Sequence, residues 1–207
     1  MGPEDIERAS MAIIAREMQD AGGWTGPEEN LPVVRRVVHT TADFDFVTNL
    51  RFSPDAVALG RAALRRGVTV VTDTAMAAAG ISRPSAARWG VEVVCRMADP
   101  EIKEESLRRG VTRAVVSMER AAAETPDAIF AIGNAPTALI RLCELVREGR
   151  ARPSLVIGVP VGFVNVAESK ETLVATGVPC IAAMGRKGGS PVAVAIVNAL
   201  LYGMDDG

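Results

Sequence analysis

The stretch Ala128-Ile129-Phe130-Ala131-Ile132-Gly133-Asn134-Ala135-Pro136 contains the pattern that decides the fold. Five successive apolar residues are typical of a strand that is buried on both faces of a sheet. Gly133 and Asn134 interrupt the apolar run, and Pro136 suits the first turn of a helix, which we expect to close at Gly149. The stretch therefore predicts a buried strand followed directly by a helix, the repeating unit of an α/β fold.

The same unit recurs along the chain. Four further apolar runs are typical of buried strands, and turn residues or a helical pattern follow each: Val68–Val71, Val91–Cys95, Leu155–Val159 and Cys180–Met184. Strands that alternate with helices indicate a parallel sheet covered on both faces, with right-handed crossovers. We predict a three-layer α/β/α architecture with a mostly parallel central sheet of about five strands. Because no linker rich in Pro, Gly or Ser interrupts the sequence, we expect residues 1–207 to form a single domain.

Composition excludes several classes of protein. The net charge of −2 and the lack of a long basic run argue against a nucleic-acid partner. The acidic start, Met1-Gly-Pro-Glu-Asp5, is unlike a secretory signal. The most apolar stretch, Val192–Leu201, is too short to span a bilayer. We therefore expect a cytoplasmic protein with no membrane partner.

The sequence also lacks the usual metal and nucleotide motifs. Its three cysteines, Cys95, Cys143 and Cys180, lie far apart, and a single histidine cannot complete a Cys/His zinc site with them. No P-loop, GxGxxG turn or GxSxG elbow follows any predicted strand. We expect reduced structural thiols, no metal site and no bound cofactor.

His39, the only histidine, is the main candidate for acid–base chemistry. The valines of residues 33–38 recur at the spacing of one helical stripe, so a helix is expected to start at Thr25 or Asn30 and to end near His39. The helix dipole would favour an imidazolium there, whereas the two arginines one turn earlier would oppose it, which leaves its charge open. A hydrogen-bonded structural histidine is the alternative.

In open parallel sheets, ligands bind beyond the carboxyl ends of the strands. Four turns are expected at that edge: Thr72–Thr74, Gly133–Thr137, Pro160–Phe163 and Gly185–Ser190. The last turn combines two fixed cations with glycines ahead of a helix, which predicts an anion site, although a basic turn that only caps the helix is the alternative. In Gly133–Thr137 the Asn-x-Pro pattern explains a helix start by itself. Asp73 fits a ligand contact and a helix cap equally well.

Five motifs occur in order between Ser10 and Leu200. They are RVVHTTAD at 36–43, TDTAM at 72–76, IGNAPTAL at 132–139, GVPVGFVNVAESK at 158–170, and GRKGGS at 185–190 with Asn198 behind it. Together they resemble the precorrin-8X / cobalt-precorrin-8 methylmutase family of cobalamin biosynthesis. One departure is Ala42, which stands where many relatives have glycine.

The resemblance implies an isomerase that moves a methyl group from carbon 11 to carbon 12 of a corrin precursor. It would convert precorrin-8X to hydrogenobyrinate, or cobalt-precorrin-8 to cobyrinate. His39 matches the family's catalytic histidine and is the implied proton donor, while Ser10 and Arg113 match residues at the substrate pocket. The resemblance also implies a homodimer with pockets near the subunit interface. It implies no separate cofactor, since any cobalt would arrive inside the substrate.

A corrin precursor is a large, flat, apolar ring fringed with carboxylates, which suits anion-binding turns around an apolar floor. The candidate site residues are His39 for catalysis and, for substrate binding, Ser10, Thr72, Asp73, Arg113, Asn134, Gly162, Arg186, Lys187 and Ser190. Two alternatives are a non-catalytic corrinoid carrier and a nicotinamide-dependent oxidoreductase of similar topology.

Overall fold

The computed structural model describes residues 2–20 and 22–204. Its strands form one sheet in the order β1-β6-β5-β4-β2-β3. The strands are β1 (Leu50–Phe52), β2 (Val70–Thr72), β3 (Val93–Val94), β4 (Ile129–Ile132), β5 (Leu155–Gly158) and β6 (Cys180–Ala183). Every neighbouring pair is parallel except β1 with β6. The predicted α/β fold with a mostly parallel sheet is confirmed, with six strands instead of about five.

The additional strand is β1, which the sequence pattern did not predict. It has three residues, and Arg51 is exposed between buried Leu50 and half-buried Phe52. Such a short alternation is not distinguishable from a loop by periodicity. Its position depends on β6: Ser53 donates its N–H to Cys180 O at 2.9 Å, and its Oγ accepts the Cys180 N–H, also at 2.9 Å. The edge strand is thus defined by a partner far away in the sequence.

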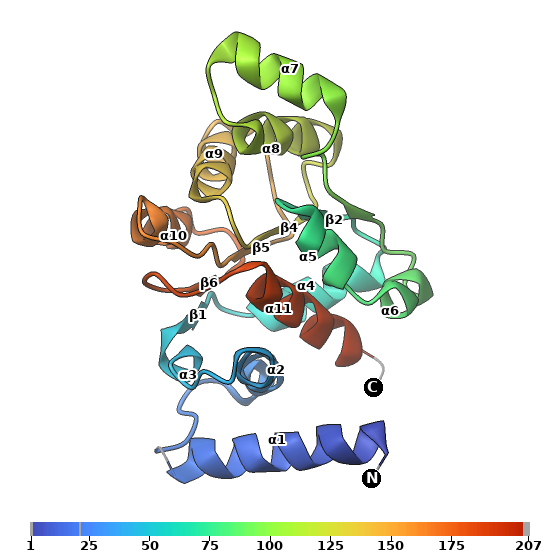
Figure 1. Ribbon diagram of the computed structural model, residues 1–207, viewed down its shortest axis with the longest axis vertical. Helices are drawn as coiled ribbons and strands as arrows, with labels where there is room; N and C mark the ends of the chain where they lie inside the picture. Colours follow the sequence, from blue (N-terminus) through green and yellow to red (C-terminus); the bar gives the residue numbers. More distant parts are fainter. Residues whose placement is uncertain (1, 21, 205–207) are drawn as a thin grey trace.

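Helices cover both faces of the sheet (Figure 1). One face carries α8 (Arg113–Glu124), α9 (Pro136–Arg147) and α10 (Val166–Val174), and α7 (Pro100–Arg109) packs on the outer side of α8. The other carries α4 (Ala56–Arg65), α5 (Ala75–Gly80), α6 (Arg83–Arg88) and α11 (Ser190–Tyr202). Successive side chains of β4 point to opposite faces of the sheet. Phe130 and Ile132 belong to the core under α8 and α9. Ile129 and Ala131 belong to the core under α4 and α11.

Two helices extend the second face beyond the predicted three layers. Helix α2 (Leu31–Thr41) packs on α11, and α1 (Pro3–Asp20) packs on α2, so α1 lies far from the sheet in Figure 1. The short segments η1 (Glu28–Asn30) and α3 (Phe46–Asn49) flank α2. Of the two predicted starts for α2, the one at Asn30 is confirmed and the one at Thr25 is wrong, because Pro32 lies in the first turn. None of the helices in the described ranges is long and apolar enough to cross a membrane.

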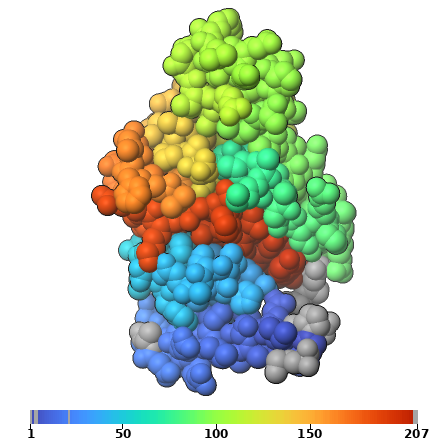
Figure 2. All heavy atoms as spheres, in the orientation of Figure 1, coloured from blue at the N-terminus to red at the C-terminus, as the bar shows by residue number. Residues whose placement is uncertain are grey.

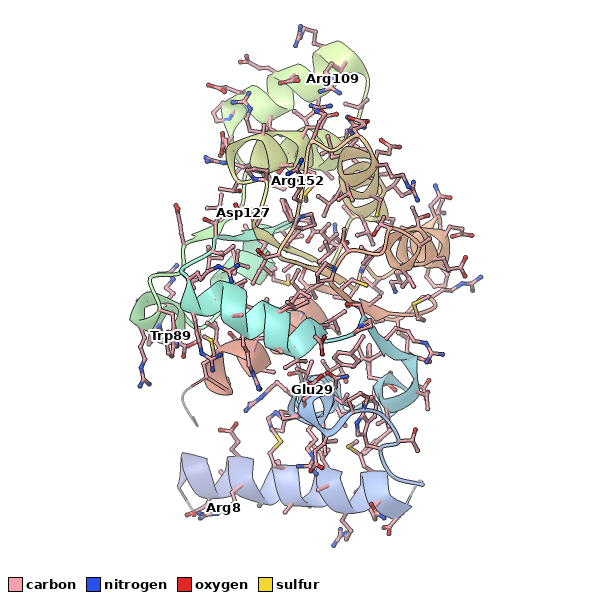
Figure 3. The ribbon with its side chains drawn as sticks, turned by 180° about the vertical axis from the view of Figure 1, so that it is seen from behind. Arg8, Glu29, Trp89, Arg109, Asp127 and Arg152 are labelled. Atoms are coloured by element: carbon pink, nitrogen blue, oxygen red, sulfur yellow. The ribbon has the colours of Figure 1, made fainter. Side chains whose placement is uncertain are left out.

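The amino ends of the strands lie away from the predicted site. Figure 3, the view from behind, labels Asp127 and Arg152, which precede β4 and β5. The turns that were predicted to bind a ligand all follow the carboxyl ends of strands β2, β4, β5 and β6, which are neighbours in the sheet. The sheet order therefore brings these four turns to one edge.

Candidate active site

The four turns at the carboxyl edge contact one another directly. Gly189 N–H donates to Val159 O at 2.8 Å, and Gly162 N–H donates to Arg186 O at 3.2 Å. The hydroxyls of Thr74 and Ser190 lie 2.9 Å apart. Figure 2 shows that the red C-terminal segment passes between the orange and teal segments above it and the light-blue segment below it. Segments distant in the sequence thus form one continuous surface.

Asp73 holds the turn after β4. Its Oδ1 accepts the N–H of Gly133 at 3.0 Å, and its Oδ2 accepts those of Asn134 at 2.8 Å and Ala135 at 2.7 Å. Burial raises the pKa of this carboxyl, while the three backbone donors oppose the shift. The anion position at the start of α9 is therefore filled by the protein's own carboxylate. With 1% of its surface exposed and both carboxylate oxygens bound to backbone N–H groups, Asp73 belongs to the frame of the site.

Thr72 and Ser190 are also inside the frame. Thr72 is fully buried, and its hydroxyl donates to Thr74 O at 3.1 Å. Ser190 is 8% exposed and starts α11, where its hydroxyl pairs with Thr74. Thr74 caps α5 by accepting the Ala77 N–H. It lies within the TDTAM motif but is not among the site residues predicted from the sequence. Its position before an alanine-rich helix was the available signal.

Gly188, in the Gly185–Ser190 turn, and Gly133, in the turn after β4, serve close packing within the protein. A Cβ at Gly188, where φ is +157°, would lie 2.1 Å from Val159 O. A Cβ at Gly133 would lie 2.7 Å from Ser190 Cα. The sequence predicted that the glycines of the Gly185–Ser190 turn allow close approach of a ligand, whereas at Gly188 the close approach is to another backbone segment of the protein.

The two cations of this turn have different environments. Lys187 Nζ lies 2.6 Å from Oδ2 of both Asp43 and Asp45. The hydrogen bond with Lys187 lowers the pKa of Asp43, and the same carboxylates raise the pKa of Lys187. The Arg186 guanidinium lies 5.4 Å from the ring centroid of Phe163 and makes no ion pair with a residue in the described ranges. Arg186 is thus the more available of the two for a ligand anion.

His39 lies in the last turn of α2, as predicted, and is exposed. The helix ends at Thr41 and is capped by Ala42, whose φ of 52° is left-handed and whose N–H donates to Val38 O at 2.8 Å. Within the part of the chain that the structure describes, the His39 imidazole has no hydrogen-bond partner, which gives no support to a hydrogen-bonded structural histidine.

The structure brings Arg113, Asn134 and Gly162 to the carboxyl edge of the sheet and places Ser10 apart from them, on α1. Ser10 is half-buried on α1 and donates its hydroxyl to Ile6 O at 2.9 Å. Arg113 is exposed at the start of α8, next to Thr112, whose hydroxyl lies 3.3 Å from that of Thr137 in the turn after β4. Asn134 is exposed, and Gly162 is half-buried with a φ of +145°.

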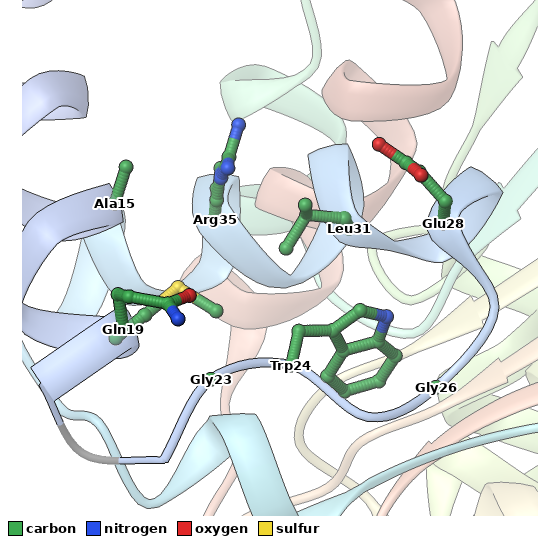
Figure 4. A pocket seen from close by; sticks show the side chains of 9 residues that line it. Ala15, Gln19, Gly23, Trp24, Gly26, Glu28, Leu31 and Arg35 are labelled. Atoms are coloured by element: carbon green, nitrogen blue, oxygen red, sulfur yellow. The ribbon is translucent and has the colours of Figure 1, made fainter.

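A cavity of about 330 Å³ opens between α2, α5 and α11. Its lining residues are Arg36, Thr40, Met76, Gly80, Pro191, Val194, Ala195, Asn198 and Tyr202. Thr40 is the chain neighbour of His39, so the cavity lies beside the end of α2. A second cavity, of about 220 Å³, surrounds Trp24 between α1 and α2 and does not include the strand ends (Figure 4). No cluster of three or more His, Cys, Asp or Glu suited to a metal occurs among residues 2–20 and 22–204.

A mostly parallel α/β sheet with a cavity, an available cation and an exposed histidine near its carboxyl edge is the arrangement in which proteins of this class bind small molecules. The precorrin-8X methylmutase family model matches residues 5–203. The chain therefore belongs to the precorrin-8X methylmutase family and is an isomerase of the intramolecular-transferase kind, so the oxidoreductase alternative is wrong.

Individual relatives agree with this assignment. Cobalt-precorrin-8 methylmutase of Priestia megaterium is 44% identical over 205 residues, which cover 99% of this chain and 90% of the relative. Precorrin-8X methylmutase of Pseudomonas aeruginosa is 41% identical over 200 residues, which cover 94% of this chain and 93% of the relative. The structure of precorrin-8x methyl mutase from Thermus thermophilus matches with a TM-score of 0.88 and 40% identity, covering 97% of this chain and 98% of the other.

Proposed function

We propose that this protein moves a methyl group from C-11 to C-12 of a corrin precursor in cobalamin biosynthesis, with His39 as the proton donor. The substrate is precorrin-8X, which gives hydrogenobyrinate, or cobalt-precorrin-8, which gives cobyrinate. The observation that carries the proposal is the position of the single histidine: it is exposed in the last turn of α2, the helix whose residues Arg36 and Thr40 line the cavity between α2, α5 and α11.

The surface around His39 suits a large, flat ring. A cavity of about 330 Å³ is at the small end for ligand sites, so a macrocycle would also cover the surrounding turns. Large apolar side chains are exposed there: Met76 (69%), Val161 (48%), Phe163 (82%) and Val164 (76%). Exposed apolar groups of this kind favour a ligand with an apolar face.

Peripheral carboxylates of the ring would be bound at the edge of this surface. Arg186 is exposed next to Phe163, and Arg113 and Asn134 are exposed beside the turn after β4. Guanidinium groups bind carboxylates with two parallel hydrogen bonds, which also orient the ring. Asp73, Thr72 and Ser190 contribute indirectly, because they hold the turns from which these side chains project.

Binding in this orientation lets His39 act on the macrocycle. Protonation of the ring, or a strong hydrogen bond to it, weakens its conjugation, so the methyl group can migrate in a sigmatropic step, and tautomerisation of the product prevents reversal. One positioned proton donor is enough for this isomerisation, and the turns supply orientation and exclude water. No dedicated cofactor is required, and cobalt, where present, is part of the substrate. We place the enzyme in the cytoplasm as a homodimer whose pockets lie near the subunit interface.

The test is conversion of the two substrates. The protein is incubated with precorrin-8X and, separately, with cobalt-precorrin-8, and the absorption spectrum is followed for the rearranged chromophore. We expect conversion of at least one form by the wild type, and tight binding without conversion by His39→Ala. If the wild type binds both forms and converts neither, the protein is a corrinoid carrier and the proposal fails.

A further inference from the structure

Lys170 is a fully buried cation on α10. Its Nζ donates to two main-chain carbonyl oxygens, Gly185 O and Lys187 O, each at 2.8 Å. Within residues 2–20 and 22–204 it has no carboxylate partner. The lysine thus contacts the Gly185–Ser190 turn from inside the protein, through the backbone on both sides of Arg186.

An ammonium group inside a protein has a large desolvation cost. Burial accordingly lowers the pKa of Lys170 to about 8. Filling the same space with an apolar side chain would avoid this cost. Unlike an apolar side chain, the amine donates two directed hydrogen bonds, and both acceptors belong to a single turn of the candidate site.

That turn is connected to the rest of the site on its outer side. Arg186 projects from it toward Phe163, and Lys187 reaches Asp43 and Asp45, which follow the helix of His39. The turn also accepts the Gly162 N–H through Arg186 O. Movement of the backbone at residues 185–187 would therefore change the position of Arg186 and the ion pairs of Lys187 together.

We propose that Lys170 is a positioning residue for the methylmutase reaction: it holds the Gly185–Ser190 turn so that Arg186 faces the substrate and Lys187 bridges to the segment after His39. The inference rests on the proposed function in one respect, that this turn contacts the substrate. The hydrogen bonds that hold the turn can be tested without any substrate.

The experiment uses Lys170→Met, which keeps the length of the side chain and removes its donors. Lys170→Gln, which keeps N–H donors on a shorter side chain, is the second variant. Lys103→Met, an exposed lysine of α7, is the matched control. Amide hydrogen exchange of the folded proteins is measured at Gly162 and Gly189, whose N–H groups join this turn to the one after β5, and at strand β5 as an internal reference.

We expect exchange at Gly162 and Gly189 to be about tenfold faster or more in Lys170→Met, intermediate in Lys170→Gln, and unchanged in the control and in β5. Unchanged exchange at both glycines would overturn the proposal. Faster exchange throughout the chain, or loss of the fold in both variants, would also overturn it, since Lys170 would then be a general core residue.

Kinetics test the role in catalysis. Because Arg186 would bind the substrate and the transition state alike, Lys170→Met should raise KM about tenfold and change kcat less than about threefold. In the double variant with Lys187→Met, KM should stay within about twofold of the Lys170→Met value, because both changes release the same turn. If the double variant raises KM by the product of the two single increases, the proposal is contradicted. If the wild type converts neither substrate, the proposed function fails, and the exchange result alone decides whether Lys170 holds the turn.

Discussion

Lys187 Nζ and Asp43 Oδ2 lie 2.6 Å apart although 144 positions separate the two residues in the sequence. This ion pair joins the turn after β6 to the segment that follows His39. The sequence predicted Lys187 as a free cation for a substrate anion. In the structure a substrate carboxylate would have to compete with Asp43 and Asp45 for it, so the ion pair connects two parts of the site before any ligand binds.

Replacement of His39 should remove catalysis and leave the fold intact. We expect His39→Ala to lower kcat by about 100-fold or more, the range that general acid–base catalysis supplies. The side chain is exposed, so the free energy of unfolding should change by no more than about 0.5 kcal/mol. Single-turnover absorption spectra measure the rate, and titration with substrate measures binding. An undiminished rate would exclude His39 as the proton donor.

Asp73→Asn should destabilise the protein and disturb the turn after β4. The amide offers one acceptor oxygen for the three N–H groups that the carboxylate now binds, and its NH2 would face a backbone donor. We expect a loss on the order of 2 kcal/mol or more in the free energy of unfolding, measured by denaturant titration. Asp127→Asn, on an exposed residue before β4, is the control. Equal stability of the two variants would show that the Asp73 hydrogen bonds contribute little.

Gly133→Ala should separate the turn after β4 from the start of α11. The new Cβ would lie 2.7 Å from Ser190 N and 2.8 Å from Gly189 O, which are backbone atoms and cannot rotate away. We expect a destabilisation of about 3 kcal/mol, with loss of activity. Gly110→Ala, at a φ of +65° in open space, should cost only the backbone strain of about 1 kcal/mol. A comparison of thermal midpoints that ranks Gly110→Ala as the less stable protein would contradict this packing argument.

The Lys187 ion pairs should contribute to stability over a defined pH range. The pKa of Asp43 lies below its ordinary value of 3.8, so its contribution is present above that pH and is lost as the pH falls through the lowered value. The pKa of Lys187 is raised above 10.5, so its contribution is present below pH 10.5 and is lost at still higher pH. The difference in melting temperature between wild type and Lys187→Met should therefore be constant from about pH 5 to 9 and shrink below about pH 4. Because Lys187 and its two carboxylate partners are in contact with solvent, about 1 M salt should also reduce this difference in melting temperature. If the difference in melting temperature depends on neither pH nor salt, Lys187→Met acts through changed packing of the side chain and not through the ion pairs.

Local patterns predicted most of the architecture. Five of the six strands, and helix α9 from Pro136 to just before Gly149, follow from residues within a few positions of one another. The position of His39 at the end of α2 follows in the same way, from one valine stripe and Pro32. The family resemblance rests on such short motifs too, and each motif consists of residues that are neighbours in the sequence.

The sequence by itself therefore determined the α/β class, the turns at the strand ends, the place of the one histidine and the family. Tertiary structure alone decided which polar groups are available to a ligand. Asp73 meets Gly133 across 60 positions, Lys187 meets Asp43 across 144, and strand β1 forms only against β6. The physical reason is that helix and strand periodicity depends on neighbours along the chain, whereas the partner of a charge depends on which distant segments the sheet order brings together.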